Sequence, residues 1–174
     1  VLRNEETTYR HAEGNDLIKG MCVSTNLFAL LGWQPLVGRT FQAEETWPNQ
    51  YYVVLGYEFW QRRLKGDKTL LGKAITLGKK EQAYTVVGIM PPGIRFLEAK
   101  ANALVEFWIP VDRDLPEIAR GGRGCMRWSV VGRLKSGVSV KQAQTEMDTI
   151  AARIAEAEYT DPGRRASRSG PGWG

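Results

Sequence analysis

Residues 124–157 read GCMRWSVVGRLKSGVSVKQAQTEMDTIAARIAEA, and this stretch indicates the fold class most directly. Val130, Val131 and Leu134 provide the apolar positions of a short strand. Ser136-Gly137 then marks a tight turn, because serine and glycine are typical turn residues. The first part of the stretch therefore predicts a strand that ends in a turn.

The second part of the stretch predicts a long amphipathic helix. Ser139 stands as its N-cap, and Gln142 three residues later completes the pattern of a capping box. Apolar residues then recur at spacings of 3, 4, 3, 4 and 3 on one helical face: Val140, Ala143, Met147, Ile150, Ile154 and Ala157. We expect this stripe to be buried on a sheet, so that Met147→Asp would unfold the lobe. Nothing in the stretch indicates catalysis.

Length and composition describe a folded fragment rather than a membrane span. The chain has 174 residues, of which 43% are apolar, enough for one domain or two small lobes. It has no uninterrupted apolar run of about 18 residues, and its polar start does not resemble a signal peptide. Because it opens on Val1 rather than methionine, we expect it to be part of a longer protein.

The charge excess is concentrated near the end of the chain. The net charge is +5, and Arg164, Arg165 and Arg168 follow Asp161 without another acid. We interpret residues 161–174 as a basic Gly/Ser/Pro tail that is solvated. The alternative is a patch that binds nucleic acid or anionic lipid.

Cysteine and histidine usage argues against a metal site. His11 is the only histidine, so a site of the usual His/Cys type lacks ligands. Cys22 and Cys125 form no CxxC motif. They either pair in an exported protein or remain two separate thiols.

The remaining chain predicts a mixture of strands and short helices. Strands are expected over residues 17–23, 51–55, 74–77, 83–90 and 107–110. Helices are expected over residues 26–31, capped by Ser24 or Thr25, and over residues 57–64. The prediction is α+β: a small mixed β-sheet lobe with short helices, plus the βα unit packed on a second sheet.

No catalytic constellation can be assembled from the sequence. Residues 66–73, GDKTLLGK, have the wrong spacing for a phosphate-binding loop and are interpreted as a turn capped by Asp67. The adjacent acids Glu44 and Glu45 point in different directions on any regular element, so we interpret them as solvated loop residues. We therefore expect neither an enzyme nor a bound cofactor.

Aromatic residues divide into core and loop positions. Trp60, Trp108 and Trp128 lie within apolar patterns and are expected in the core. The residues predicted to contact a partner or substrate lie in loops: Trp33, Trp47 and Phe96.

Four blocks of sequence, in order, carry a family resemblance. They are STNLFALLGWQPLVGRTF (24–41), residues 51–93 from YYVVLGYEFW to VVGIMPPG, FWIPV (107–111) and WSVVGRLKSGVSVKQAQTEM (128–147). Together they resemble the periplasmic core domain of MacB-type, FtsX-like ABC-transporter permeases, especially the acidobacterial-type subgroup. Within the blocks we assign a structural role to Gly38, Arg39, Phe41, Trp60, Gly72, Gly88, Pro91, Pro92, Gly93, Gly132, Arg133, Leu134 and Gly137.

The resemblance implies a domain organisation. It comprises an N-terminal segment (1–16), a β-rich lobe (17–111), a Gly/Arg-rich linker (112–124), a strand-helix part of the membrane-proximal lobe (125–160) and the tail (161–174). It also implies a place on the periplasmic face of a bacterial inner membrane. The implied partners are the parent's transmembrane helices, a cytoplasmic ATPase, a periplasmic adaptor protein and a second permease copy.

The sequence leaves two main function classes open. The first is a non-catalytic permease domain that transmits ATP-driven conformational change and contacts a substrate or periplasmic partner. The alternative is a free-standing extracytoplasmic module that binds peptides or small molecules through its aromatic loops. Nucleic-acid binding by the arginine tail and enzymatic activity rank below both.

Overall fold

The computed structural model describes residues 1–46, 50–78, 81–95, 104–111 and 128–160, with side chains through residue 157. The chain divides into two compact units, Val1–Val131 and Gly132–Gly174, which we call the sheet unit and the helix unit. The α+β prediction is confirmed, since one mixed sheet is combined with a few helices. Within the described part of the chain, no helix has the length and hydropathy needed to cross a bilayer.

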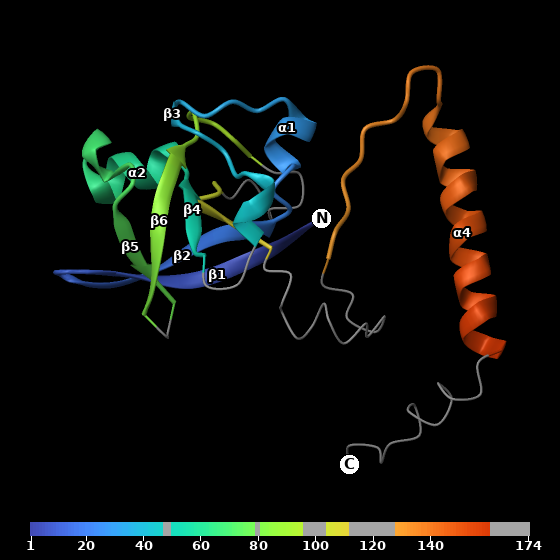
Figure 1. The fold of residues 1–174 in the computed structure, drawn as a ribbon, viewed down its shortest axis with the longest axis horizontal. Coiled ribbons are helices and arrows are strands. Elements are labelled where there is room, and N and C mark those ends of the chain that lie inside the picture. The colour runs from blue at the N-terminus through green and yellow to red at the C-terminus, as the bar shows by residue number, and fades with distance from the viewer. Residues whose placement is uncertain (47–49, 79–80, 96–103, 112–127, 161–174) are drawn as a thin grey trace, which may run out of the picture. The chain divides into compact units, whose positions relative to one another are not determined.

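The described residues of the sheet unit form seven strands and two short helices (Figure 1). Its strands are β1 (Leu2–His11), β2 (Gly14–Val23), β3 (Val37–Gly38), β4 (Tyr52–Leu55), β5 (Ala74–Leu77), β6 (Gln82–Ile89) and β7 (Phe107–Pro110). Its helices are α1 (Leu27–Leu31) and α2 (Tyr57–Leu64), with 3₁₀ turns η1 (Ala43–Thr46) and η2 (Lys68–Leu70). The helix unit contains α4 (Val140–Thr160).

Strand pairing closes six of the strands into a ring. The sheet order is β3-β6-β4-β7-β2-β1-β5, and β5 also pairs with β6. The β2–β7 and β4–β6 pairs are parallel and the others are antiparallel. The ring closes between β1 and β5, where Tyr9 is opposite Leu77 and the Gly78 N–H donates to the Thr8 carbonyl at 2.8 Å. Few strand edges therefore stay open in the described part of this unit.

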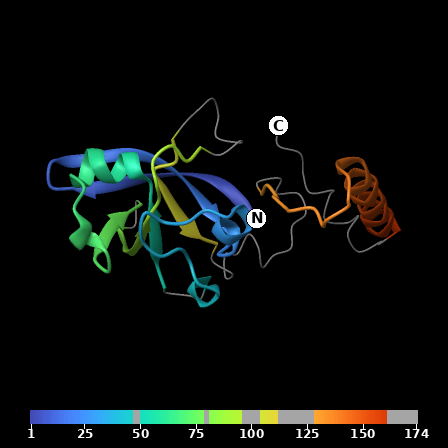
Figure 2. The same cartoon turned by 90° about the horizontal axis from the view of Figure 1, so that it is seen from above.

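Both faces of the central strands are buried, which explains their continuous apolar runs. Successive side chains of β4 alternate between two core clusters, Val53 and Leu55 in one and Val54 in the other. The α1 cluster contains Leu2, Met21, Val23, Leu27, Phe28, Phe41, Val54, Val87, Met90, Val105 and Trp108. The α2 cluster contains Tyr9, Ile18, Val53, Leu55, Phe59, Trp60, Ile75, Leu77, Val86, Ile89 and Phe107. Both views place α1 and α2 at opposite ends of the sheet unit (Figure 1, Figure 2).

Local signals predicted the two short helices correctly, with one exception. Helix α1 ends at Gly32, whose backbone is left-handed at φ 72°, and the Trp33 N–H donates to the Phe28 carbonyl at 2.9 Å. The predicted side-chain cap by Ser24 or Thr25 is wrong. The N-cap position is Asn26, which makes no side-chain capping bond, and the Ser24 hydroxyl instead accepts from the Val1 amino group.

Residues 1–16 were expected to form a separate N-terminal segment, but the structure places them in the sheet. β1 and β2 pair along ten residues each, from Leu2 opposite Val23 to His11 opposite Gly14. Leu2 and Tyr9 are buried, while the strand between them carries polar residues. The sequence signal is weak because so few of the β1 positions are apolar.

The helix unit contains the predicted helix, and the packing of this helix on a second sheet stays a prediction. The Gln142 N–H donates to the Ser139 hydroxyl at 3.2 Å, and the Ser139 N–H donates to Gln142 Oε1 at 2.8 Å, as a capping box requires. Residues 128–134 contribute only an isolated bridge at Ser129 rather than a strand, and the described residues contain no second sheet. Met147 is 61% exposed among the described residues, so the effect of Met147→Asp stays a prediction about a covering element that these residues do not include.

The cap of η2 carries a pH-dependent prediction. The Asp67 carboxylate accepts from the Thr69 N–H at 2.8 Å and from the Thr69 hydroxyl at 3.0 Å, and these bonds lower the pKa of Asp67. A carboxyl whose pKa is lowered by folding stabilises the native state above its unfolded pKa, and this contribution disappears as the pH falls through the folded pKa. We therefore expect the stability difference between wild type and Asp67→Ala to be constant above about pH 5 and to shrink below about pH 4.

Thermal melts between pH 2 and pH 8 measure this difference. Asp67→Asn is the control, because it keeps an acceptor oxygen but has no group that titrates in this range. A wild-type advantage over Asp67→Ala that persists unchanged at pH 2 would contradict the assigned cap.

Candidate functional site

Trp33 is the predicted contact residue that the structure describes. It follows the C-terminus of α1 and is half-buried against the α1 cluster. Three residues later the Leu36 N–H donates to the Ile89 carbonyl at 2.7 Å, so the loop is held against the end of β6. The Leu36 side chain is 50% exposed. The loop therefore presents an apolar side chain to solvent from a fixed backbone.

The other two predicted contact residues cannot be placed beside Trp33. Trp47 and Phe96 lie outside the described residues, as do Cys125, the 112–124 linker and the 161–174 tail. Cys22 is buried, with its Sγ 3.8 Å from the Pro110 carbonyl oxygen. Both alternatives for Cys22 and Cys125 therefore stay open, and the contact role of the three aromatic residues stays a prediction.

The sequence GRTF, residues 38–41, makes a close backbone contact with β6. Gly38 of β3 is opposite Gly88 of β6. A Cβ atom on Gly88 would lie 2.1 Å from the Arg39 carbonyl oxygen, and one on Gly38 would lie 2.3 Å from the Val87 carbonyl oxygen. Phe41 enters the α1 cluster beside Phe28, with ring centroids 5.7 Å apart. These glycines therefore allow β3 to approach β6 and deliver Phe41 to the core.

The carboxylate of Glu45 fixes the Arg39 side chain, and the predicted solvent exposure of Glu45 is wrong. Glu45 was expected to be solvated, yet it is only 5% exposed, whereas Glu44 is exposed as predicted. Arg39 Nη1 and Nη2 donate to the two Glu45 oxygens at 3.0 and 2.5 Å, and the Gln42 N–H donates to Oε2 at 2.9 Å. The hydrogen bonds to Glu45 raise the pKa of Arg39 above its ordinary value. The pair fixes the loop that leads towards Trp47.

Other motif residues lie at turns of the sheet unit. The Trp60 indole N–H donates to the Asp67 carbonyl at 3.0 Å and joins α2 to the following turn. The Gly72 N–H donates to the Val86 carbonyl at 2.8 Å. Pro91 and Pro92 follow β6, and the Gly93 N–H donates to the Glu58 carboxylate at 3.0 Å. The Glu58 contact thus connects α2 with the turn after β6, and the Gly72 contact connects the turn after η2 with the middle of β6.

The motif residues of the helix unit lie on exposed chain before α4. Gly132, Arg133, Leu134 and Gly137 are all exposed. Leu134 is 44% exposed, and a Cβ on Gly132 would meet no atom within 4 Å. The described structure therefore assigns no packing role to Gly132, in contrast to Gly88.

The beginning and the end of the sheet unit meet in a contact that the sequence did not predict. Leu2 and Ser129 exchange two backbone hydrogen bonds, both 2.9 Å. The Arg3 guanidinium lies 4.8 Å from the centroid of the Trp128 ring. We call these four residues the clasp. No local sequence signal could reveal it, because its two sides are about 125 positions apart in the printed chain.

Polar groups in the described residues form no recognisable reaction centre. His11 stacks on Tyr9 with ring centroids 5.4 Å apart, and its Nε2 lies 3.1 Å from Asp16 Oδ2. Asp16 also accepts from Arg63 at 2.8 Å. Burial, and then the Asp16 charge, raise the pKa of the Tyr9 hydroxyl. Among the described residues, no group of three possible metal ligands is found.

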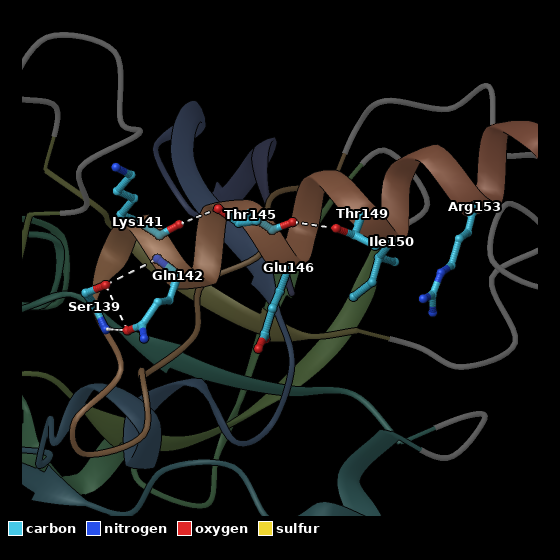
Figure 3. A pocket seen from close by; sticks show the side chains of 8 residues that line it. All are labelled: Ser139, Lys141, Gln142, Thr145, Glu146, Thr149, Ile150 and Arg153. Carbon is cyan, nitrogen blue, oxygen red and sulfur yellow. Dashed lines mark hydrogen bonds between the residues drawn. The ribbon is translucent and has the colours of Figure 1, made fainter.

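A shallow hollow runs along one side of α4 (Figure 3). The described residues that line it are Ser139, Lys141, Gln142, Thr145, Glu146, Thr149, Ile150 and Arg153. Seven of them belong to α4 and Ser139 is its N-cap, so these residues form an open surface and do not enclose a ligand.

Comparison with known proteins identifies the fold. A sequence model of the MacB-like periplasmic core domain matches residues 1–150. The extracellular domain of the noncanonic ABC-type transporter YknZ from Gram-positive bacteria superposes with a TM-score of 0.56 at 17% identity, covering 83% of this chain. The periplasmic region of MacB from Actinobacillus actinomycetemcomitans gives 0.55 at 12% identity and covers 88%. No curated protein matches the chain.

The two structural neighbours are longer than this chain, which spans 66% and 64% of their respective lengths. At these identities the superpositions show a shared fold only. The family match covers most of the sequence, including the sheet unit and the first part of α4. This chain therefore belongs to the family of MacB-like periplasmic core domains, which are parts of ABC-transporter permeases.

Proposed function

We propose that this chain is a non-catalytic extracytoplasmic domain that transmits ATP-driven conformational change within an ABC-transporter permease and contacts a substrate or periplasmic partner. The observation that carries the proposal is the family match over residues 1–150. In this proposal the domain lies on the periplasmic side of a bacterial inner membrane. It is connected to transmembrane helices of the parent permease, which works with a cytoplasmic ATPase and a periplasmic adaptor protein.

The sheet unit has physical properties that suit the transmission of motion. Its ring of paired strands and its two core clusters resist internal deformation, because close-packed interiors transmit displacement instead of absorbing it. The clasp joins the strand that opens the unit to the segment that closes it. A displacement applied to the chain at the clasp would therefore move the sheet unit as one body.

The contact role is proposed for the loop after α1. Trp33 is half-buried and anchored on the core, and Leu36 is half-exposed on a backbone fixed to β6. An anchored aromatic residue beside an exposed apolar side chain is a common arrangement at protein interfaces. Trp47 and Phe96 are proposed as further contacts on the strength of the sequence.

Spin-label distance measurements on the complete permease with its ATPase test the transmission role without knowledge of the substrate. A nitroxide at Lys68→Cys, in a Cys22→Ala, Cys125→Ser background, reports the distance between the two sheet units of a dimeric permease. We expect this distance to change by several ångströms between the nucleotide-free and ATP-bound states, and the change to be smaller in Trp128→Ala, which loosens the clasp.

Arg10→Ala is the matched control, because Arg10 pairs with Glu81 in an exposed salt bridge away from the clasp residues. It should leave the nucleotide-dependent change intact. Identical distances in both nucleotide states of the otherwise unaltered permease would refute the transmission role. The complete reading frame provides a second test, since absence of flanking apolar segments of about 20 residues would exclude a membrane-anchored parent.

A further inference from the structure

His11 is the last residue of β1, where the chain turns into β2, and its ring is anchored on the core of the sheet unit. The ring stacks on Tyr9 with centroids 5.4 Å apart, and the Tyr9 ring packs edge-on against Phe59 of the α2 cluster at 5.2 Å. The His11 side chain is only 21% exposed. The imidazole is therefore held in place, and its two nitrogens face different neighbours.

The contacts of the two nitrogens define a neutral ring. Nδ1 accepts a hydrogen bond from the Glu13 N–H at 3.3 Å. A nitrogen that accepts carries no proton, so this bond requires the neutral imidazole with its proton on Nε2. Nε2 lies 3.1 Å from Asp16 Oδ2, and both atoms are shielded from solvent without an aligned hydrogen bond to any described residue. The aligned bond of the neutral ring is thus the one to Glu13.

The backbone of the β1–β2 turn explains why a side-chain acceptor matters at this position. Ala12 and Glu13 are the two residues between the paired residues His11 and Gly14. Two-residue hairpin loops favour turns in which at least the first central residue has positive φ, but neither Ala12 nor Glu13 does. A side chain that accepts from the backbone two residues later stabilises a turn, as asparagine does in an Asx-turn. The His11 ring supplies that acceptor here.

Protonation of His11 would exchange the partner of its ring. We propose that His11 is a pH-sensitive latch: the neutral ring closes the β1–β2 turn through the Glu13 N–H, whereas the protonated ring releases that N–H and binds Asp16. In the charged ring Nδ1 carries a proton directed at the Glu13 N–H, so the acceptor is lost. Nε2 then faces the Asp16 carboxylate as part of a cation, and Coulomb attraction does not require an aligned bond. This inference does not depend on the proposed transmission role.

The groups around the ring are compatible with this exchange. Titratable groups on β1, the turn, β2 and α2 lie around the ring and its carboxylate partner: Tyr9, Glu13, Asp16 and Arg63. Arg63 donates to Asp16 Oδ1 at 2.8 Å, which leaves Oδ2 to the ring. Burial raises the pKa of the Tyr9 hydroxyl, so this group keeps its proton where imidazole titrates. Arg10, next to His11 on β1, pairs with Glu81 instead.

Amide NMR of the 174-residue chain between about pH 5 and pH 8 tests the latch, because histidine is the side chain that ordinarily titrates in this interval. We expect the Glu13 amide resonance to shift with the same midpoint as the His11 ring protons. Its protection from hydrogen exchange, corrected for the intrinsic effect of pH, should fall several-fold towards the acidic end. A Glu13 amide that does not respond while the His11 ring titrates would overturn the proposal.

Two variants at position 11 separate the acceptor from the charge. His11→Asn keeps a side-chain oxygen that accepts from the N–H two residues later but does not titrate, so the Glu13 amide should stay protected throughout the interval. His11→Phe keeps a ring that can stack on Tyr9 but has no acceptor, so the Glu13 amide should be unprotected throughout. A wild-type pH response in His11→Asn, or wild-type protection in His11→Phe, would each refute the latch.

Discussion

Gly88→Ala should destabilise the sheet unit by about 3 kcal/mol, at the upper end of what overpacking usually costs. The new Cβ would lie 2.1 Å from the Arg39 carbonyl oxygen and 3.0 Å from its carbonyl carbon. Both are backbone atoms of the segment that follows β3, so no side chain can rotate to make room. β6 and the 37–39 segment must separate, which weakens the 2.9 Å bond from the Arg39 N–H to the Val87 carbonyl. Urea unfolding followed by tryptophan fluorescence measures the loss.

Gly132→Ala is the matched control for this substitution. Gly132 belongs to the same predicted set of motif residues, but its added Cβ would meet no atom within 4 Å and its backbone is not left-handed. We expect a change of less than about 0.5 kcal/mol. Equal unfolding midpoints for the two variants would show that the approach of β3 to β6 is not tight.

Arg39→Ala should lower the stability of the sheet unit by about 2 kcal/mol. The substitution removes both guanidinium bonds to Glu45 and leaves that 5% exposed carboxylate with the Gln42 N–H. The cost comes mainly from a buried charge without its counter-ion. Because the Arg39 side chain is itself 42% exposed, water can partly replace it, and we do not expect the larger loss of a fully buried pair.

A double-mutant cycle separates the interaction energy between Arg39 and Glu45 from the other effects of each substitution. Arg39→Ala/Glu45→Ala should be less destabilised than the sum of the two single variants, because the second substitution removes the stranded charge. Arg63→Ala is the control, since its ion pair with Asp16 has side chains 39% and 22% exposed and should contribute under about 1 kcal/mol. If Arg39→Ala cost no more than Arg63→Ala, Glu45 would not need its counter-ion.

Elements that depend on neighbouring residues could be predicted well from the sequence. The capping box of Ser139 and Gln142, the end of α1 at Gly32 and the turn capped by Asp67 all appear as expected. Each uses hydrogen bonds between residues at most a few positions apart. Such local signals can be identified in the sequence without knowledge of the tertiary structure.

The candidate site was less predictable, because its contacts join distant positions. Glu44 and Glu45 are adjacent acids with the same local preferences, yet only Glu45 points at Arg39 and is buried. The pairing of Leu2 with Ser129 has no local signal at all. In β1, alternating polar residues obscured a strand that becomes stable only when β2 pairs along its whole length.

The sequence by itself determined the α+β class, the family and the position and apolar face of α4. Those properties follow from short-range hydrogen bonding and helical periodicity, which need no knowledge of neighbouring elements. Only the tertiary structure decided which apolar residues the single chain covers. The run Val53-Val54-Leu55 is enclosed on both faces by the α1 and α2 clusters, whereas Leu17 of β2 and Leu36 of the loop after α1 stay exposed within the same unit. Burial depends on which distant segments pack together, and periodicity carries no information about that.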